Sequence, residues 1–261
     1  MKRVRLAFKF LYYLLSAKNR HGIHSPFVYH LVDKVIYDKT PFPVYHEIEI
    51  IRKELITNEK EISIEDYGAG SSVNPSKRRK ISEITTHSLK SRKYGQLLFR
   101  LVKNYNPNTI LELGTSLGIT TLYLAKGQLK GKIFTIEACP ETSAVASAIF
   151  EKTGMEEIQF MNGKFEDIIP DLLLQLPSLD FVFFDGNHRK EPTLSYFKAC
   201  IEMAGENSVF VFDDIHWSEE MEEAWELIKN HPKVTFTIDL FFIGLVFFRK
   251  ERHRQHFKIR Y

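Results

Sequence analysis

One apolar run constrains the fold of this chain more than any other feature, because it ends in an acid-x-glycine turn. Residues 110–118 read ILELGTSLG, and a second apolar run ends in an acid nineteen residues after Gly118, at Glu137. Gly114 and Gly118 can adopt backbone angles that a Cβ would forbid, and they let a ligand approach the main chain closely. A strand that turns through glycines into a helix is typical of a parallel nucleotide-binding sheet. We therefore expect a ligand at the carboxyl end of this first strand.

Two carboxylates indicate what kind of ligand the turn binds. Glu137 ends the second strand, where a carboxylate can accept hydrogen bonds from both hydroxyls of a ribose. The triple glycine that a dinucleotide's pyrophosphate requires is missing. Glu112 precedes the first glycine, where it would repel a phosphate but could hold an ammonium, directly or through water. These residues favour S-adenosylmethionine, which carries a ribose, an adenine and an amino-acid moiety; an ordinary strand and turn without a ligand is the alternative.

Strand-like and helix-like runs alternate from residue 108 onward, which is the pattern of a parallel sheet with crossover helices. A helix is expected over 91–105, and another that begins near Pro140 and ends near Gly154. The runs 234–240 and 243–248 are close enough to form a hairpin, which gives a seven-stranded α/β sheet with an antiparallel edge. The five preceding strands are expected at 108–114, 132–138, 158–163, 179–185 and 208–214.

The composition predicts one main domain. A chain of 261 residues with 44% hydrophobic residues can bury one large core. Its two cysteines, Cys139 and Cys200, lack metal-ligand spacing, and the N-terminus does not read as a signal peptide, so we expect a reduced, cytoplasmic setting. We divide the chain into an N-terminal helical extension (1–90), a nucleotide-binding domain (91–250) and a basic C-terminal tail (251–261).

Both ends of the chain are strongly basic. Residues 1–20 carry six Lys or Arg and no acid, and residues 249–261 carry six Lys or Arg and one acid. Such ends can contact phosphates or anionic lipid, or remain solvated tails. The apolar segment 4–17 is too short and too charged to span a bilayer. A helix packed on the domain is the simpler expectation for it, and peripheral membrane contact through residues 1–20 is the alternative.

Two later strands are expected to end in carboxylates, Asp185 after one and Asp213 with Asp214 at the end of the other. Because the carboxyl ends of parallel strands meet at one edge of a sheet, these three side chains should converge. Three oxygen ligands suit a hard cation such as Mg²⁺, which would orient a substrate hydroxyl and lower its pKa. Aspartates that only cap helices or form a turn are the alternative. His188 is a candidate for the group that takes the substrate proton, with a solvent-facing loop histidine as the alternative.

Taken together, these stretches resemble the class I S-adenosylmethionine-dependent methyltransferases, in particular bacterial members of the cation-dependent catechol O-methyltransferase-like branch. The likeness runs from about residue 91 to residue 248. The resemblance implies a Rossmann-like, doubly wound sheet of seven strands in the order 3-2-1-4-5-7-6, with the last strand antiparallel. The matching stretches are 110–118, 135–137 with Pro140 and Glu141, MNGKFEDIIP at 161–170, FDG at 184–186 and FDD at 212–214.

The resemblance also implies roles for single residues. Glu137 would bind the ribose. Gly163 and Phe165 match the segment that flanks the adenine. The residues expected around the methionine part of the cofactor are Glu112, Gly114, Ser116 and Gly118.

The same resemblance assigns the metal ligands to Asp185, Asp213 and Asp214. Asp214 replaces a frequent asparagine, and His188 stands where catechol-type members carry a general-base lysine. Sugar- and macrolide-modifying relatives have similar Asp-Gly-x-His loops, so the acceptor need not be a catechol. In related enzymes the segment before the first strand forms a lid, and by analogy four residues should border the acceptor pocket: His21, His24, Tyr67 and Lys93.

The sequence therefore predicts methyl transfer from S-adenosylmethionine to an oxygen of a small hydroxylated acceptor, assisted by a divalent cation. Two alternatives stay open. One is metal-independent methylation of nitrogen or of nucleic acid, aided by the basic ends. The other is a non-catalytic cofactor-binding module held at a membrane or a partner by its N-terminus. The first hypothesis involves no nucleic acid, and it leaves the oligomeric state open; an NAD-dependent reductase is the weakest reading because the triple glycine is missing.

Overall fold

The computed structural model describes residues 2–65, 67–68, 76–128, 130–155, 157–250 and 253–261. The chain forms two compact units. The central unit is Lys39–Gln175, and the terminal unit combines Met1–Asp38 with Leu176–Tyr261. The boundaries of these units differ from those of the predicted segments 1–90, 91–250 and 251–261. The division of the chain into those functional segments stays a prediction.

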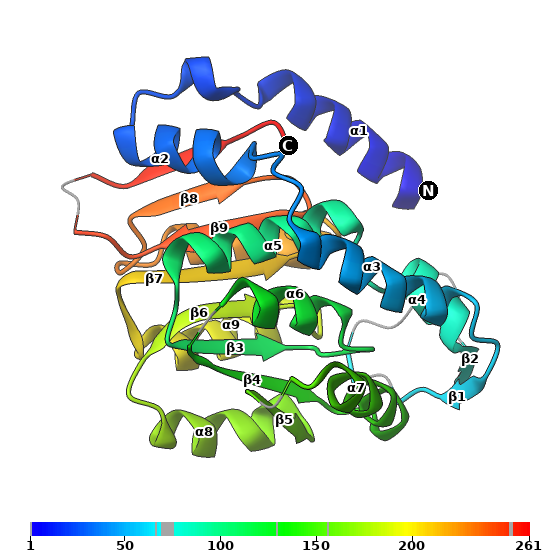
Figure 1. The fold of residues 1–261 in the computed structure, drawn as a ribbon. Helices are drawn as coiled ribbons and strands as arrows, with labels where there is room; N and C mark the ends of the chain where they lie inside the picture. The colour runs from blue at the N-terminus through cyan, green and yellow to red at the C-terminus, as the bar shows by residue number, and fades with distance from the viewer. Residues whose placement is uncertain (1, 66, 69–75, 129, 156, 251–252) are drawn as a thin grey trace. The chain divides into compact units, whose positions relative to one another are not determined.

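The central unit alternates strands and helices, and its strands β3, β4 and β5 are parallel neighbours (Figure 1). A separate antiparallel pair, β1 with β2, precedes them. The elements are α3 (Pro43–Ile56), β1 (Glu61–Ser63), β2 (Arg78–Lys80), α4 (Ile81–His87), α5 (Arg92–Tyr105), β3 (Thr109–Leu113), α6 (Ile119–Gly127), β4 (Lys132–Glu137), α7 (Pro140–Thr153), β5 (Ile158–Asn162) and α8 (Phe165–Gln175).

Local sequence explains where these elements begin and end. All five residues of β3 are buried, as the uninterrupted run around Ile110 predicts for a parallel strand covered on both faces. Helix α5 ends at Asn106, whose left-handed backbone (φ 45°) closes the helix directly before Pro107. Pro140 opens α7 and Gly154 closes it in the left-handed conformation, so both predicted helix boundaries are confirmed.

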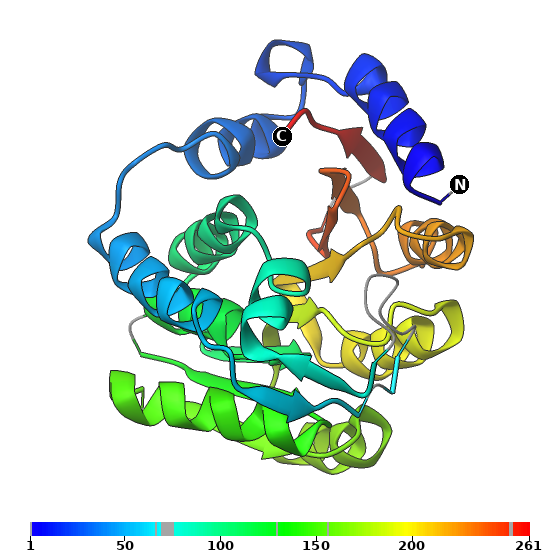
Figure 2. The ribbon, with the colours of Figure 1, turned by 90° about the vertical axis from the view of Figure 1, so that its right-hand side faces the viewer.

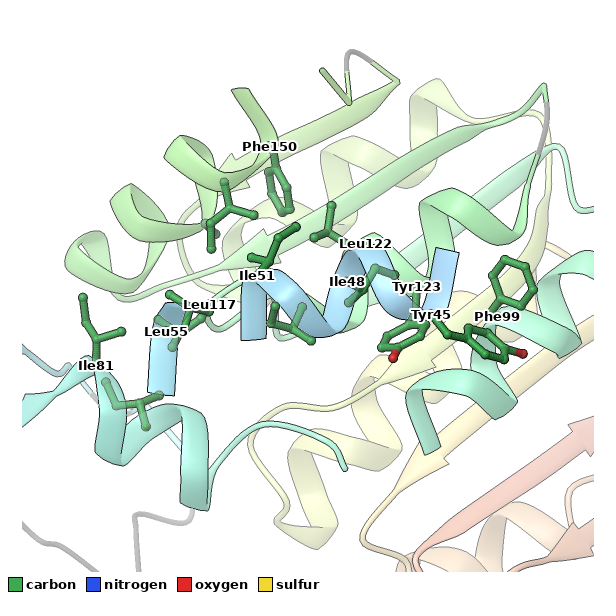
Figure 3. Close-up of a cluster of buried hydrophobic side chains, with 14 of the residues drawn as sticks. Tyr45, Ile48, Ile51, Leu55, Ile81, Phe99, Leu117, Leu122, Tyr123 and Phe150 are labelled. Atoms are coloured by element: carbon green, nitrogen blue, oxygen red, sulfur yellow. The ribbon is translucent and has the colours of Figure 1, made fainter. Parts of the chain in front are cut away.

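The core of the central unit joins α3 to the turn and helix that follow β3. Figure 3 shows side chains of α3 directed toward residues of the β3–α6 segment and of α7. Tyr45 packs its ring edge-on against Phe99 of α5, with the ring centroids 5.2 Å apart. Leu117 and Tyr123 are fully buried in this cluster. Helix α3, which the sequence placed in a separate extension, is therefore part of the core that supports the glycine turn.

The terminal unit contains the other strands. Strand β7 pairs in parallel with β6 and antiparallel with β9, β9 pairs antiparallel with β8, and β10 pairs in parallel with β8. The elements are α1 (Lys2–Ser16), η1 (Arg20–Gly22), α2 (Pro26–Leu31), η2 (Val32–Ile36), β6 (Leu179–Phe184), α9 (Lys190–Ile201), β7 (Ala204–Asp213), α10 (Glu219–Lys229), β8 (Phe236–Asp239), β9 (Ile243–Phe247) and β10 (Gln255–Lys258).

The strand order is β10-β8-β9-β7-β6-β3-β4-β5. When β10 is left out, β3 is counted as strand 1 and the sheet is followed from β5 to β8, the order is 3-2-1-4-5-7-6. Strand β9 is the seventh strand in this numbering, and it runs antiparallel to both its neighbours. The predicted fold class, the five parallel strands and the terminal hairpin are therefore confirmed. None of the helices among the described residues is both long enough and apolar enough to cross a membrane.

The predicted number of seven strands is wrong by one, because part of the expected basic tail forms β10. Gln255 pairs with Phe236 and Lys258 with Asp239. This four-residue strand contains one large apolar residue, Phe257, so its sequence has no apolar pattern that could announce it. Its position depends on backbone pairing with β8 and on the buried side chain of Ile259 next to it.

Candidate functional site

The turn that follows β3 has a strained backbone held by hydrogen bonds. Gly114, Ser116 and Gly118 have φ angles of 107°, 49° and 82°. A Cβ on Gly118 would lie 2.8 Å from the ring of Phe150, so glycine is required there by space as well as by conformation. The backbone N–H of Ser116, a residue rarely found with positive φ, donates to the Glu137 carboxylate at 2.8 Å. The end of β4 therefore fixes the shape of the turn.

Glu137 is anchored at both carboxylate oxygens. Oε2 accepts from the Ser116 N–H, and Oε1 accepts from the N–H of Cys139 at 2.9 Å. Burial raises the pKa of Glu137, and the backbone hydrogen bonds oppose that rise by favouring the charged form. A carboxylate oxygen has more than one acceptor position. Both oxygens can therefore accept a further hydrogen bond from a ligand while their geometry stays fixed.

Glu112 lies beneath the turn and is fully buried. Its Oε2 accepts from the hydroxyls of Thr121 at 2.5 Å and Thr135 at 2.7 Å, whereas its buried Oε1 has no hydrogen-bond partner among the described residues. Burial raises the pKa of Glu112 to about 7, the two threonine hydrogen bonds oppose the rise, and the nearby Glu137 charge adds to it. Because Glu112 has no exposed surface, a bound ammonium would need a bridging water or a shift of the turn to reach it.

The end of β5 is also tied to Glu137. The N–H of Gly163 donates to the Glu137 main-chain oxygen at 3.0 Å, and the side-chain amide of Asn162 donates to the same oxygen at 2.9 Å. Gly163 has a φ of 154°, and a Cβ there would lie 2.9 Å from Ile168. Phe165, partly buried, begins α8 directly beyond. Every residue predicted to bind the cofactor therefore lies at the ends of β3, β4 and β5, in one unit.

A segment that precedes the sheet lies against the same strand ends. The N–H of Ser63 donates to Glu141 at 2.9 Å, and the Cys139 thiol lies 3.4 Å from the Ser63 main-chain oxygen. The ammonium of Lys164 lies 5.1 Å from the centre of the Tyr67 ring. Of the four residues expected to border the acceptor pocket, the structure thus places Tyr67 beside the segment expected to flank the adenine. Sequence reasoning gave no role to Lys164, and only this long-range contact identifies it.

The terminal unit holds the acidic cluster. Asp213 ends β7, and Asp185 follows β6, whose last residue Phe184 pairs with Phe212. The ligand atoms of Asp185, His188 and Asp213 all lie within 4.8 Å of one another. The His188 Nε2 is 3.7 Å from an Asp185 carboxylate oxygen, and Asp213 is buried.

His188 joins this group because the loop after Asp185 curls back. Asn187 and His188 have φ angles of 70° and 46°, and the His188 N–H donates to the Gly186 oxygen at 3.0 Å. The third predicted ligand, Asp214, is not part of the group. It has a φ of 53°, and its N–H donates to the Phe242 oxygen at 2.7 Å. Asp185 and Asp213 therefore converge as expected, with the His188 imidazole as the third member of the group.

The donor set of this cluster fits a divalent cation. Two carboxylates supply charge and hard oxygen ligands, while imidazole nitrogen suits Mn²⁺, Fe²⁺, Co²⁺ or Zn²⁺ better than Mg²⁺. The remaining coordination positions would be left for water and for oxygens of a substrate. The roles of the individual residues in cofactor and metal binding stay predictions.

Part of the chain is similar to known methyltransferases. A family model described as "Methyltransferase domain" matches residues 111–215. The chain is 32% identical over 126 residues to a "Catechol O-methyltransferase" of Niastella koreensis, and this alignment covers 47% of this chain and 55% of that protein. It is 39% identical over 84 residues to a "Transmembrane O-methyltransferase" of Homo sapiens, and this alignment covers 31% of this chain and 29% of that protein. The chain thus spans about half or less of these curated relatives.

Solved structures show the same fold. An O-methyltransferase from Bacillus cereus, in a structure described as a complex with SAH, aligns with a TM-score of 0.57 at 18% identity. The alignment covers 84% of this chain and 95% of that one. At this level of identity the likeness concerns the fold.

Proposed function

We propose that this protein transfers the methyl group of S-adenosylmethionine to an oxygen of a small hydroxylated acceptor. Residues 111–215 match a methyltransferase domain, and part of the chain is similar to a catechol O-methyltransferase, which supports this proposal. The observation that carries the proposal is Glu137. Its carboxylate ends β4 and is held at both oxygens by backbone N–H groups, one of them from the glycine turn. A fixed carboxylate at this strand end is the group that a ribose needs.

The central unit would hold the cofactor without binding a phosphate. Glu137 would accept hydrogen bonds from the two ribose hydroxyls, and the turn 114–118 would face the methionine part. Gly163 and Phe165 would flank the adenine. Gly114 has no side chain, so a sulfonium ligand can approach the main chain closely there. The predicted cofactor residues include no Lys or Arg that would bind a phosphate.

The terminal unit would hold the acceptor through a divalent cation on Asp185, Asp213 and His188. A divalent cation would supply orientation of the acceptor hydroxyl and a lower pKa for it. The two carboxylates would balance the ion's charge. With His188 as a ligand, its Nε2 would not be available as the proton acceptor that the sequence predicts. Catalysis would then rest on the alignment of the acceptor oxygen with the methyl group and the sulfur.

The role of His188 can be separated experimentally. Replacing it with Ala removes an imidazole ligand, and we expect the affinity for Mn²⁺ to fall about 10- to 100-fold. The electron paramagnetic resonance signal of the free ion measures this affinity. Unchanged Mn²⁺ affinity together with slower turnover would instead assign His188 to proton transfer.

The proposed reaction is tested with the full chain and S-adenosylmethionine labelled on its methyl carbon. Catechols, phenols, sugars and RNA are supplied as acceptors, each with chelator and again after addition of Mg²⁺ or Mn²⁺. We expect label in a hydroxylated acceptor only when a divalent cation is present. Transfer that persists in chelator, or label in RNA, would support the metal-independent alternative. Cofactor binding without transfer to any acceptor pool would support the non-catalytic module.

A further inference from the structure

Helix α1 is fixed to the terminal unit by one of its faces. Phe10 packs edge-on against Phe241, with ring centroids 4.9 Å apart, and the buried Tyr13 lies against the same ring at 5.3 Å. Leu6 and Leu14 extend this contact along the helix. The inner face of α1 therefore belongs to the core, and the helix is not a loose tail.

Ion pairs hold the helix in the same position. The Lys9 ammonium lies 2.6 Å from a carboxylate oxygen of Glu222, and Arg5 pairs with Glu219. Glu222 also contacts His216 at 3.0 Å, and the other nitrogen of this imidazole contacts Asp239 at 2.9 Å. Burial lowers the pKa of His216, but the hydrogen bonds to Asp239 and Glu222 outweigh burial and raise it. The orientation of α1, and hence of its outer face, is thereby fixed.

The outer face of α1 is apolar and exposed. Its five large residues are between 54% and 78% exposed, and their spacing of four, three, one and three places them on one stripe of a helix. Single exposed apolar residues are ordinary on a protein surface, but a continuous stripe of them marks an interaction site. The stripe residues are Val4, Phe8, Leu11, Tyr12 and Leu15.

Basic residues from the other end of the chain lie beside this stripe. The C-terminal segment runs along the end of α1, where Lys18 donates its N–H to the Lys258 oxygen at 2.9 Å and accepts from the Arg260 N–H at 2.9 Å (Figure 2). The Lys258 ammonium lies 5.6 Å from the centre of the Tyr12 ring. The Arg260 guanidinium donates to the Leu14 main-chain oxygen. All three basic side chains are exposed, so the two basic ends of the sequence form one basic rim (Lys18, Lys258 and Arg260) next to the stripe.

We propose that the outer face of α1 and this basic rim dock on the surface of an anionic lipid bilayer. Apolar side chains beside exposed Lys and Arg suit the boundary between acyl chains and anionic headgroups, where a helix lies in the plane of the surface. A second copy of this chain would bring an identical basic rim against the first, which disfavours it as the occupant. Charge complementarity therefore selects an anionic surface. This inference does not depend on the proposed methyl transfer.

The experiment is flotation of the full chain with vesicles of phosphatidylcholine and phosphatidylglycerol, and separately with pure phosphatidylcholine. We expect flotation with the anionic vesicles and at least about a fivefold lower bound fraction with the neutral ones, since each basic residue near the surface contributes about a fivefold factor in affinity. Raising the salt concentration should release the protein.

Three variants separate the contributions. Phe8→Ser with Leu15→Ser should abolish flotation, and Lys18→Gln with Lys258→Gln should reduce it about 10-fold or more. Leu174→Ser removes a side chain that is 86% exposed on α8 in the central unit, and it should float like the wild type. Thermal unfolding of each variant shows whether it is folded.

Three results would overturn the inference. The first is no flotation of the wild type, and the second is equal flotation with neutral and anionic vesicles. The third is a dimer in sedimentation that Phe8→Ser with Leu15→Ser dissociates, which would assign the stripe to a second copy.

Discussion

The Glu137 site of the central unit and the acidic cluster of the terminal unit differ in how much of their geometry exists before any ligand binds. In the central unit, Glu137 is bound at both oxygens by backbone N–H groups of the chain itself. In the terminal unit, the carboxylates of Asp185 and Asp213 lie within 4.8 Å of each other and of His188. Two carboxylates this close repel each other, and a cation between them would remove that repulsion. We infer that the Glu137 site is preformed for its ligand, whereas the acidic cluster would be completed by a cation.

The largest expected effect is at the acidic cluster. Replacing Asp185 with Asn removes one charge that would bind the cation, so Mn²⁺ affinity and turnover should each fall more than about 100-fold. Binding of S-adenosylhomocysteine, measured by calorimetry, should stay within about twofold of wild type, because the predicted cofactor residues lie in the other unit. The control is Asp171→Asn, an exposed aspartate on α8, which should change neither. Normal cation binding in the Asp185 variant would show that a cation does not complete the acidic cluster.

The second effect concerns pH and Glu112. Its pKa is raised from 4.5 to about 7 in the folded protein, so between these values the folded state binds a proton that the unfolded state has released. Folding stability from this group is thus greatest below about pH 4.5 and decreases as the pH rises to about 7, by about 3 kcal/mol. Urea unfolding of the wild type and of Glu112→Gln at several pH values measures this pH dependence of the free energy of unfolding. Parallel pH profiles for the two proteins would show that the pKa of Glu112 is not raised in the folded protein.

A smaller effect separates space from backbone conformation in the glycine turn. Gly118→Ala puts a methyl group 2.8 Å from the Phe150 ring in a backbone with φ 82°, whereas Gly154→Ala at φ 62° meets nothing within 4 Å. Both variants should lose about 1 kcal/mol from the strained φ, and Gly118→Ala should lose about 1–3 kcal/mol more from crowding. Chemical unfolding measures both. Equal losses would show that the turn can move away from Phe150. The geometry of the turn would then not be fixed before the ligand binds.

The smallest expected effect is at Lys164. Its ammonium lies 5.1 Å from the Tyr67 ring, and Lys164→Met should lower the free energy of unfolding by about 0.5 kcal/mol, since the pair is exposed. The control is Lys53→Met at an exposed position of α3. If the variant also weakens S-adenosylhomocysteine binding while the control does not, Tyr67 and Lys164 belong to the preformed Glu137 site. Unaltered binding would limit their role to packing.

The sequence predicted those parts of the molecule in which local pattern and structure coincide. The buried run around Ile110, the glycine turn and the helix boundaries at Pro140 and Gly154 all follow from short-range chemistry, and the structure confirms the fold that they imply. Strand β10 could not be predicted, because its four residues owe their conformation to pairing with β8.

The candidate site shows the same limit. Which aspartates converge follows from strand ends, and so Asp185 and Asp213 were found. Whether Asp214 or His188 completes the group depends on the left-handed backbone of both residues, which nothing in their side chains dictates. The cluster of His216 with Glu222 and Asp239 was missed for a related reason, since its members come from three successive elements, the loop after β7, α10 and β8, whose side chains meet only in the folded chain.

The measurement that tests the account most directly is calorimetric titration of the full chain with S-adenosylhomocysteine, for the wild type, for Glu137→Gln and for Glu151→Gln, an exposed control on α7. The account predicts binding by the wild type and the control, and an affinity at least about 10-fold lower for Glu137→Gln, because the amide cannot accept from both ribose hydroxyls while holding the two backbone N–H groups. Equal binding by all three proteins would contradict the assignment of Glu137 to the ribose. Absence of binding by the wild type would contradict the proposed methyltransferase activity.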